Sequence, residues 1–251
     1  MKTIAIINQK GGVGKSTTAH AVGAGLKRAG HSVLFVDLDA QGNLSFSMGA
    51  DAQGGYNAMG VIQRPETITD EIQRTPAGDI VASSPSLAGA DTIITETGKE
   101  YRLKEALGHV AGAYDFCILD TPPALGILTV NALTACSGAI IPAQADVFSL
   151  QGVLQLRSTM QAVKQYCNPG LKVYGILLSR FNPRAVLSRD MAELAEETAR
   201  SMKTRVFAAR IRECTALKEA QAKQATIYDY APKSNAAADY SALVGELLSI
   251  K

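Results

Sequence analysis

The stretch NQKGGVGKSTT, residues 8–18, is the strongest structural signal in the chain. It follows a short β-branched run, Thr3–Ile7, and opens a helical pattern over Ser16–Ala29 that Gly30 ends. A glycine-rich turn between a strand and a helix lets backbone N–H groups converge at the positive end of the helix, where phosphate oxygens bind. The stretch therefore predicts a phosphate-binding loop, and a tight glycine turn without a ligand is a much weaker interpretation.

The loop residues have separate expected roles. Lys15 is placed to reach the β- and γ-phosphates of a nucleotide, and the Ser16 hydroxyl is placed to ligate Mg²⁺. The expected nucleotide-binding residues are Lys10, Gly11, Gly12, Val13, Gly14, Lys15, Ser16 and Thr17.

Three aspartates follow buried strand patterns. In VLFVDLDAQGN, residues 33–43, Asp37 ends a strand and Asp39 lies just beyond it, and in FCILDTPP, residues 116–123, Asp120 ends another. Carboxylates at the C-terminal edge of parallel strands lie beside the ligand in open α/β sheets. Each aspartate alone would fit a helix cap or a turn, but together with the glycine loop they indicate one magnesium nucleotide site.

The rest of the chain alternates strand and helix patterns. Strands are expected over Val33–Val36, Asp79–Ala82, Phe116–Leu119, Ala139–Pro142 and Lys172–Leu178, and helices over Leu125–Ala135, Leu150–Tyr166, Leu187–Met202 and Ala236–Ile250. This order predicts an α/β fold with a mostly parallel, twisted sheet and helices on both faces. We expect residues 1–251 to form a single domain, in which residues 49–77 make an irregular surface excursion.

Composition excludes several other classes. The 251 residues are 47% hydrophobic, too many for a disordered chain, and no apolar run approaches the roughly 18 residues of a membrane span. The N-terminal apolar stretch is too short for a secretory signal, so we expect a cytoplasmic protein. The four cysteines form no CxxC pair, which favours reduced thiols over a disulfide or a metal site.

Charge divides unevenly along the chain. Residues 1–150 carry 10 basic and 14 acidic side chains, and residues 151–251 carry 15 and 9, so the net charges are −4 and +6. The basic second half fits a polyanion such as nucleic acid, and a solvated helical surface explains it equally well.

KGGVGKS departs from the general phosphate-loop pattern, because Gln9 stands at the first glycine position and Lys10 follows it. In this respect the chain resembles the ParA/MinD-type P-loop ATPases. The segments DTPPALGILTVNAL, IPAQADVFSLQGVLQL and YAPKSNAAADY look like those of the small ParA (Soj-type) partition proteins, so the resemblance covers nearly the whole chain. It implies a P-loop NTPase fold, an ATP-dependent homodimer, slow hydrolysis of ATP with Mg²⁺, binding to DNA without sequence specificity, and a ParB-like partner that stimulates hydrolysis.

The resemblance also implies residue roles. Lys10 would reach across the dimer to the other subunit's phosphates, Asp120 would hold Mg²⁺ through water, Asp37 would support the metal's water shell, and Asp39 would position the attacking water. Among the DNA contacts of the family, one arginine matches Arg184, while the position of a second is Ala216. Arg212, Lys218 and Lys223 lie near that position and are the expected substitutes. The adenine pocket of the family falls near Ser179–Arg180 and Ile211–Arg212.

Two alternatives belong to the same superfamily. A membrane-cycling regulator of the MinD type needs a basic amphipathic C-terminal helix, but YSALVGELLSIK carries only Lys251 as a base and Glu246 as an acid. Its apolar residues are typical of a helix that faces the core, so no membrane partner is expected. The second alternative is a metal-cluster or metabolic enzyme of the same superfamily, and the lack of suitably placed cysteine pairs argues against a nitrogenase-reductase-like cluster. We therefore expect a cytoplasmic, nucleoid-associated partition ATPase.

Overall fold

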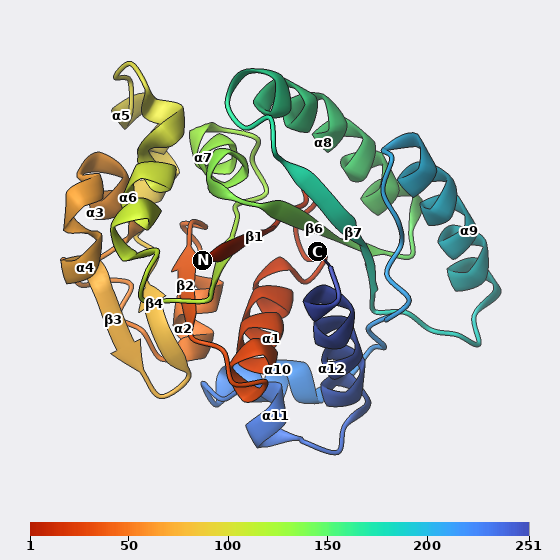
Figure 1. Ribbon diagram of the computed structural model, residues 1–251. Coiled ribbons are helices and arrows are strands. Elements are labelled where there is room, and N and C mark those ends of the chain that lie inside the picture. Colours follow the sequence, from red (N-terminus) through yellow and green to blue (C-terminus); the bar gives the residue numbers. More distant parts are fainter. Residues whose placement is uncertain (251) are drawn as a thin grey trace.

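The computed structural model describes residues 1–250, and for residues 147–151 it describes the backbone alone. Across these residues the strands form one sheet of seven in the order β3-β4-β2-β5-β1-β6-β7 (Figure 1). Its strands are β1 (Lys2–Ile6), β2 (Val33–Asp37), β3 (Ile72–Thr75), β4 (Gly78–Val81), β5 (Phe116–Asp120), β6 (Gly138–Gln144) and β7 (Lys172–Ser179). All neighbours pair in parallel except β3 and β4, which form an antiparallel hairpin at one edge.

Helices cover both faces of the sheet, as expected (Figure 1). One layer contains α3 (Ala58–Gln63), α4 (Ile68–Glu71), α5 (Ala90–Ile93), α6 (Arg102–Val110), α7 (Ile127–Ala135), α8 (Val147–Tyr166) and α9 (Val186–Ser201). The other contains α1 (Lys15–Arg28), α2 (Asn43–Met48), α10 (Ala216–Ala222), α11 (Ile227–Tyr230) and α12 (Asn235–Leu248). Three short 3₁₀ turns lie at Pro65–Thr67, Pro85–Gly89 and Lys99–Tyr101. No helix among these residues is long and apolar enough to cross a membrane.

The central strands are buried on both faces, because each face packs against its own helical layer. Every residue of β2 and β5 is buried, which explains why their sequences are continuous apolar runs rather than alternating ones. The helix α1 approaches the sheet closely at Gly23, where an added Cβ would lie 2.1 Å from the ring of Phe35. The close contact between Gly23 and Phe35 fixes the distance of α1 from β2, and with it the position of the phosphate loop that precedes α1.

The expectation for residues 49–77 is wrong in part. The segment holds α3, α4 and β3, and the side chains of Met59, Val61, Ile62 and Ile68 lie in the core. These elements are only four to six residues long. Periodicity is hard to recognise over so few residues, which is why the sequence pattern looked irregular.

Candidate functional site

The loop between β1 and α1 has the backbone shape that its glycines predict. Gly12 and Gly14 adopt φ angles of +76° and +92°, a left-handed conformation that favours glycine. A Cβ added at Gly11, Gly12 or Gly14 would meet no atom of the described chain within 4 Å, so the loop borders open space. Gly14 caps α1, and none of the described side chains caps this helix start. The first N–H groups of α1 are thus available to an anion.

The ends of β6 and β7 hold this loop from behind. The Asn8 Nδ2 donates to the Pro142 carbonyl at 2.7 Å, and the Gln144 Nε2 donates to the Gly12 carbonyl at 2.8 Å. The Ser179 Oγ donates to the Val13 carbonyl at 2.8 Å. These bonds hold the loop against the ends of β6 and β7 and occupy the carbonyls of Gly12 and Val13.

Lys15 is a buried cation at the centre of the site. Its side chain belongs to a residue only 7% exposed, and its Nζ donates to the Lys10 carbonyl at 3.3 Å. Burial lowers the pKa of Lys15, and the negative charges of Asp120 and Asp39 oppose that change. Among the described residues the Lys15 Nζ forms no ion pair, so a polyphosphate would give it a direct anionic partner.

Asp37 and Asp120 end neighbouring strands and pair with each other in the β2–β5 register. Asp37 is completely buried and accepts hydrogen bonds from the backbone N–H and the hydroxyl of Ser45 at 2.8 and 2.7 Å. Burial raises its pKa to about 6, against the opposing effect of the Ser45 bonds. Asp37 is therefore anchored through one oxygen by α2.

Asp120 has no such anchor. Its two carboxylate oxygens are buried, and within residues 1–250 neither has a hydrogen-bond partner. Burial, followed by the charge of Asp37, raises its pKa, while the nearby Ser16 hydroxyl and Lys15 oppose the rise. An unpartnered buried carboxylate is costly unless a cation or water fills the gap. Asp120 and Ser16 thus fit a hydrated Mg²⁺ ion, which prefers few protein ligands together with phosphate oxygens.

The remaining metal chemistry is consistent with this kind of ion. Among the described residues, no group of three or more His, Cys, Asp or Glu side chains is arranged to hold a metal by itself. A metal at this site would need oxygens from water and from the nucleotide. Asp39 lies at the same edge, half-buried, and its Oδ1 accepts the Gln41 backbone N–H at 3.1 Å.

A cavity of about 660 Å³ opens from the loop, a size that suits a nucleotide. Its floor is residues 11–17 with Asp39, and its far wall includes Ser179, Arg180, Ile211 and Arg212, the region expected to hold the adenine. Thr17 is tied to this wall, because its Oγ1 accepts a hydrogen bond from the Gln221 Nε2 of α10 at 3.0 Å. The wall therefore comes from parts of the chain that lie about 165 to 205 residues away from the loop.

Lys10 turns toward its own protomer. Its Nζ lies 2.8 Å from Oδ1 and 2.9 Å from Oδ2 of Asp146, which follows the end of β6. Its backbone N–H donates to the Asn8 Oδ1 at 3.0 Å. Sequence reasoning found Lys10 but missed Asp146, although Asp146, like Asp39, follows the carboxyl end of a strand.

The four expected DNA contacts differ in exposure and in what they contact. Arg184 is exposed in the turn before α9, and Lys223 is exposed at the end of α10. Arg212 and Lys218 line the nucleotide cavity. The Arg212 guanidinium is also paired with Asp239, at 2.6 Å. For these two residues a DNA role stays a prediction, and their position assigns them first to the cavity wall.

Comparison with known proteins gives consistent matches. A family model described as an AAA domain matches residues 1–173. The sporulation initiation inhibitor protein Soj of Bacillus subtilis is 36% identical over 250 residues, covering 98% of each chain. The chromosome partitioning protein ParA of Myxococcus xanthus is 37% identical over 256 residues, covering 98% of this chain and 88% of the relative. A crystal structure of a cobyrinic acid a,c-diamide synthase from Mycobacterium smegmatis, with bound ADP and magnesium, superposes with a TM-score of 0.86 at 34% identity, covering 99% of this chain and 94% of that one.

Proposed function

This chain belongs to the ParA/Soj-type P-loop ATPases, and from that premise we propose that it is a DNA-partitioning ATPase that cycles between a monomer and an ATP-bound, DNA-bound dimer. Residues 1–251 act together as its ATPase domain. The observation that carries the proposal is the phosphate loop with Lys10 and Lys15 beside three carboxylates at one edge of the sheet, facing an open cavity.

The site binds ATP with Mg²⁺. The N–H groups of residues 11–17 and the Lys15 ammonium would hold the phosphates, and Ser16 and Asp120 would hold the metal. When bound, Mg²⁺ neutralises charge on the phosphates. Asp37, fixed by Ser45, orients the water shell, and Asp39 positions the attacking water.

Dimerisation uses Lys10. In the sandwich that we propose, two cavities face each other and Lys10 leaves Asp146 to contact the phosphates of the other subunit. The ion pair with Asp146 is between partly exposed groups, so its loss costs little compared with a new contact to a triphosphate.

The dimer binds the nucleoid through phosphate contacts that include Arg184 and Lys223, without reading base sequence. Two protomers double the contacts, so at physiological salt the affinity for DNA depends on ATP. A ParB-like partner stimulates hydrolysis and releases the dimer.

The membrane-cycling alternative is disfavoured by the C-terminal helix. The apolar side chains of α12, including Tyr240, Leu243 and Leu247, are buried against the core. A helix used this way has no apolar face left for lipid. The Mycobacterium smegmatis structure is named for a synthase activity, whereas the sequence relatives are named for chromosome partitioning, and we propose the partitioning role for this chain.

The test is DNA binding measured without nucleotide, with ADP, with ATP and with a slowly hydrolysed ATP analogue, at about 150 mM salt. We expect tight binding only with ATP or the analogue, to unrelated sequences alike.

Two variants extend this test. Lys15→Ala should abolish nucleotide binding in calorimetry and with it DNA binding. Arg184→Ala should weaken all sequences equally and make the salt dependence shallower by about one to two units, since a dimer loses two contacts. DNA binding that is indifferent to nucleotide at this salt concentration would overturn the proposal.

A further inference from the structure

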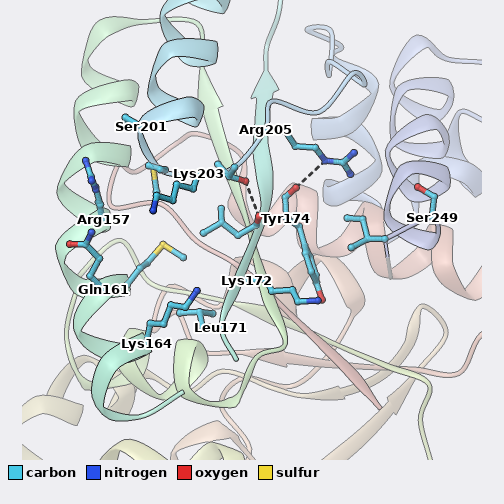
Figure 2. A pocket seen from close by; sticks show the side chains of 15 residues that line it. Arg157, Gln161, Lys164, Leu171, Lys172, Tyr174, Ser201, Lys203, Arg205 and Ser249 are labelled. Carbon is cyan, nitrogen blue, oxygen red and sulfur yellow. Dashed lines mark hydrogen bonds between the residues drawn. The ribbon is translucent and has the colours of Figure 1, made fainter. Parts of the chain in front are cut away.

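A second hollow, of about 870 Å³, is shown in Figure 2. It lies at the opposite edge of the sheet from the nucleotide cavity, as the strand directions show. Lys172 begins β7 and Lys2 begins β1, whereas the phosphate loop follows the end of β1. Because β1, β6 and β7 are parallel, their starts share one edge and their ends the other. The hollow is bounded by the C-terminal half of α8, the start of β7 and the segment after α9.

The side chains around this hollow are strongly cationic. Figure 2 shows Arg157 and Lys164 on the α8 side and Arg205 on the side of Ser249. The cations that line it are Arg157, Lys164, Lys172, Lys203 and Arg205, and all are exposed. No Asp or Glu lines it in the part of the chain that the structure describes. Much of the excess positive charge of residues 151–251 is therefore gathered here.

The positive surface continues beyond the hollow. A neighbouring depression shares Lys172 and Tyr174 and adds Lys2 and Lys104. Burial and the nearby charge of Lys172 lower the pKa of Lys2. An anionic ligand bound beside Lys2 and Lys172 would offset this repulsion.

The backbone at Lys203 points to a role for its side chain. Lys203 has φ +55°, just after α9, where glycine is the usual residue. The turn is closed by bonds from the Lys203 and Thr204 N–H groups to the carbonyls of Arg200 and Ala199, at 3.0 and 2.9 Å. A lysine in this conformation is less favourable than glycine for the fold, yet it places an ammonium group at the hollow.

The accessible surface favours a ligand held by charge. Three apolar side chains beneath the cations, Met160, Leu171 and Tyr174, are only 5%, 3% and 6% exposed. Met202 and Ile250 also line the hollow and are half-buried, so the choice of a polyanion rests on the five cations and not on a lack of apolar surface. The Tyr174 ring also has the Lys2 Nζ over it at 5.1 Å, so it offers no open face on which a base could stack.

We propose that this hollow binds the phosphate backbone of duplex DNA, in a contact that each monomer can make without nucleotide. The proposal rests on the DNA-binding function above for the identity of the ligand. The proposed site differs in location from the dimer interface, because a dimer formed through the nucleotide edge of the sheet leaves this opposite edge exposed. With about four phosphate contacts, such binding would weaken about fiftyfold between about 50 and 150 mM salt, which hides it under physiological conditions.

The experiment measures the anisotropy of a labelled duplex of about 20 base pairs with nucleotide-free protein at about 50 mM salt. The double variant Lys164→Glu/Lys203→Glu should bind at least about tenfold more weakly, with a salt slope shallower by about two units. Arg64→Glu/Arg74→Glu is the matched control, because it changes net charge equally at exposed residues in the first half of the chain. It should bind within about twofold of the unmodified protein.

A second variant separates binding from folding. Lys203→Gly should weaken binding and flatten the salt slope by about one unit without lowering the melting temperature, because glycine suits the left-handed turn. Equal affinity of the Lys164→Glu/Lys203→Glu variant and its control, or no binding by unmodified protein at low salt, would overturn the proposal. If the Lys164→Glu/Lys203→Glu variant and its control bind DNA equally well, the cations of the hollow would instead bind carboxylates of a protein partner. If ATP fails to strengthen binding at about 150 mM salt while the hollow variants still weaken it at about 50 mM, the partition function fails and this inference stands.

Discussion

The Lys10 ammonium and the Asp146 carboxylate are paired within one protomer, at 2.8 and 2.9 Å from its two oxygens. Both side chains are 31% exposed, so water still reaches the pair. The lysine that we propose to cross the dimer interface therefore starts from a bound position, and Asp146 competes with the other subunit's nucleotide for it.

Removing that competitor should favour the dimer. For Asp146→Ala we expect ATP-dependent dimerisation at about fivefold lower protein concentration, because about 0.5 kcal/mol is recovered in each of two protomers. Light scattering over a concentration series measures this. Asp70→Ala, at an exposed acid on α4, should change nothing.

Lys10→Ala should bind nucleotide but stay monomeric. If this variant dimerises normally, the role that we propose for Lys10 is wrong.

Hydrolysis should depend on Asp39. Asp39→Ala removes the group that we propose to orient water, while the phosphate loop stays intact. ATP should still bind, and single-turnover hydrolysis should slow by at least the tenfold that about 1.4 kcal/mol represents. The protein should then accumulate as a DNA-bound dimer. A rate within about twofold of the unmodified protein would remove Asp39 from the mechanism.

The buried, unpartnered Asp120 should cost stability when no metal is present. In EDTA at pH 7, Asp120→Asn should raise the melting temperature by about 2–4 °C, corresponding to about 1 kcal/mol, because it removes a buried charge. The gain should shrink as the pH falls, since Asp120 itself becomes protonated. Asp79→Asn is the contrast, because the Asp79 carboxylate accepts a hydrogen bond from Tyr114 at 2.8 Å and its loss should not stabilise. A lower melting temperature for Asp120→Asn would show that the carboxylate has a stabilising partner.

Acid should destabilise the fold through His20. This residue is 4% exposed, and burial lowers its pKa from 6.5 to about 4. Between these pH values His20 takes up a proton in the unfolded chain but not in the folded one, so its contribution to stability falls by about 3 kcal/mol as the pH drops from about 6.5 to 4. The raised pKa of Asp37 acts in the opposite direction in this window, so the contribution of His20 is read from the difference between variants. Urea unfolding of His20→Gln at both ends of this range should show a smaller pH dependence than the unmodified protein. His31→Gln, at a half-exposed histidine, is the control, and equal pH dependence of all three would exclude His20.

The nucleotide edge was predictable because its signals are local. Residues 8–18 carry the loop within one strand–turn–helix unit, and Asp37 and Asp120 each follow their own apolar strand. The parallel sheet with two helical layers follows from the alternation of such units and is confirmed.

What could not be predicted depends on pairing across long distances. Asp146 meets Lys10 across 136 positions, and Gln221 meets Thr17 across 204. The cations of the second hollow come from three separate segments, and each alone reads as an ordinary solvated lysine or arginine. Only the folded chain shows which of them share a surface.

Because α10 forms part of the wall of the nucleotide cavity, a bound nucleotide should stabilise α10 against local opening. Since Ile211, Arg212 and Gln221 border the same space as the phosphate loop, any local opening that detaches α10 also destroys the nucleotide site. ADP at about a hundred times its dissociation constant would add about 2.7 kcal/mol to the free energy of that opening. Amide hydrogens of α10 should then exchange with solvent about a hundredfold more slowly. The bound nucleotide thus stabilises the contact between the N-terminal phosphate loop and α10.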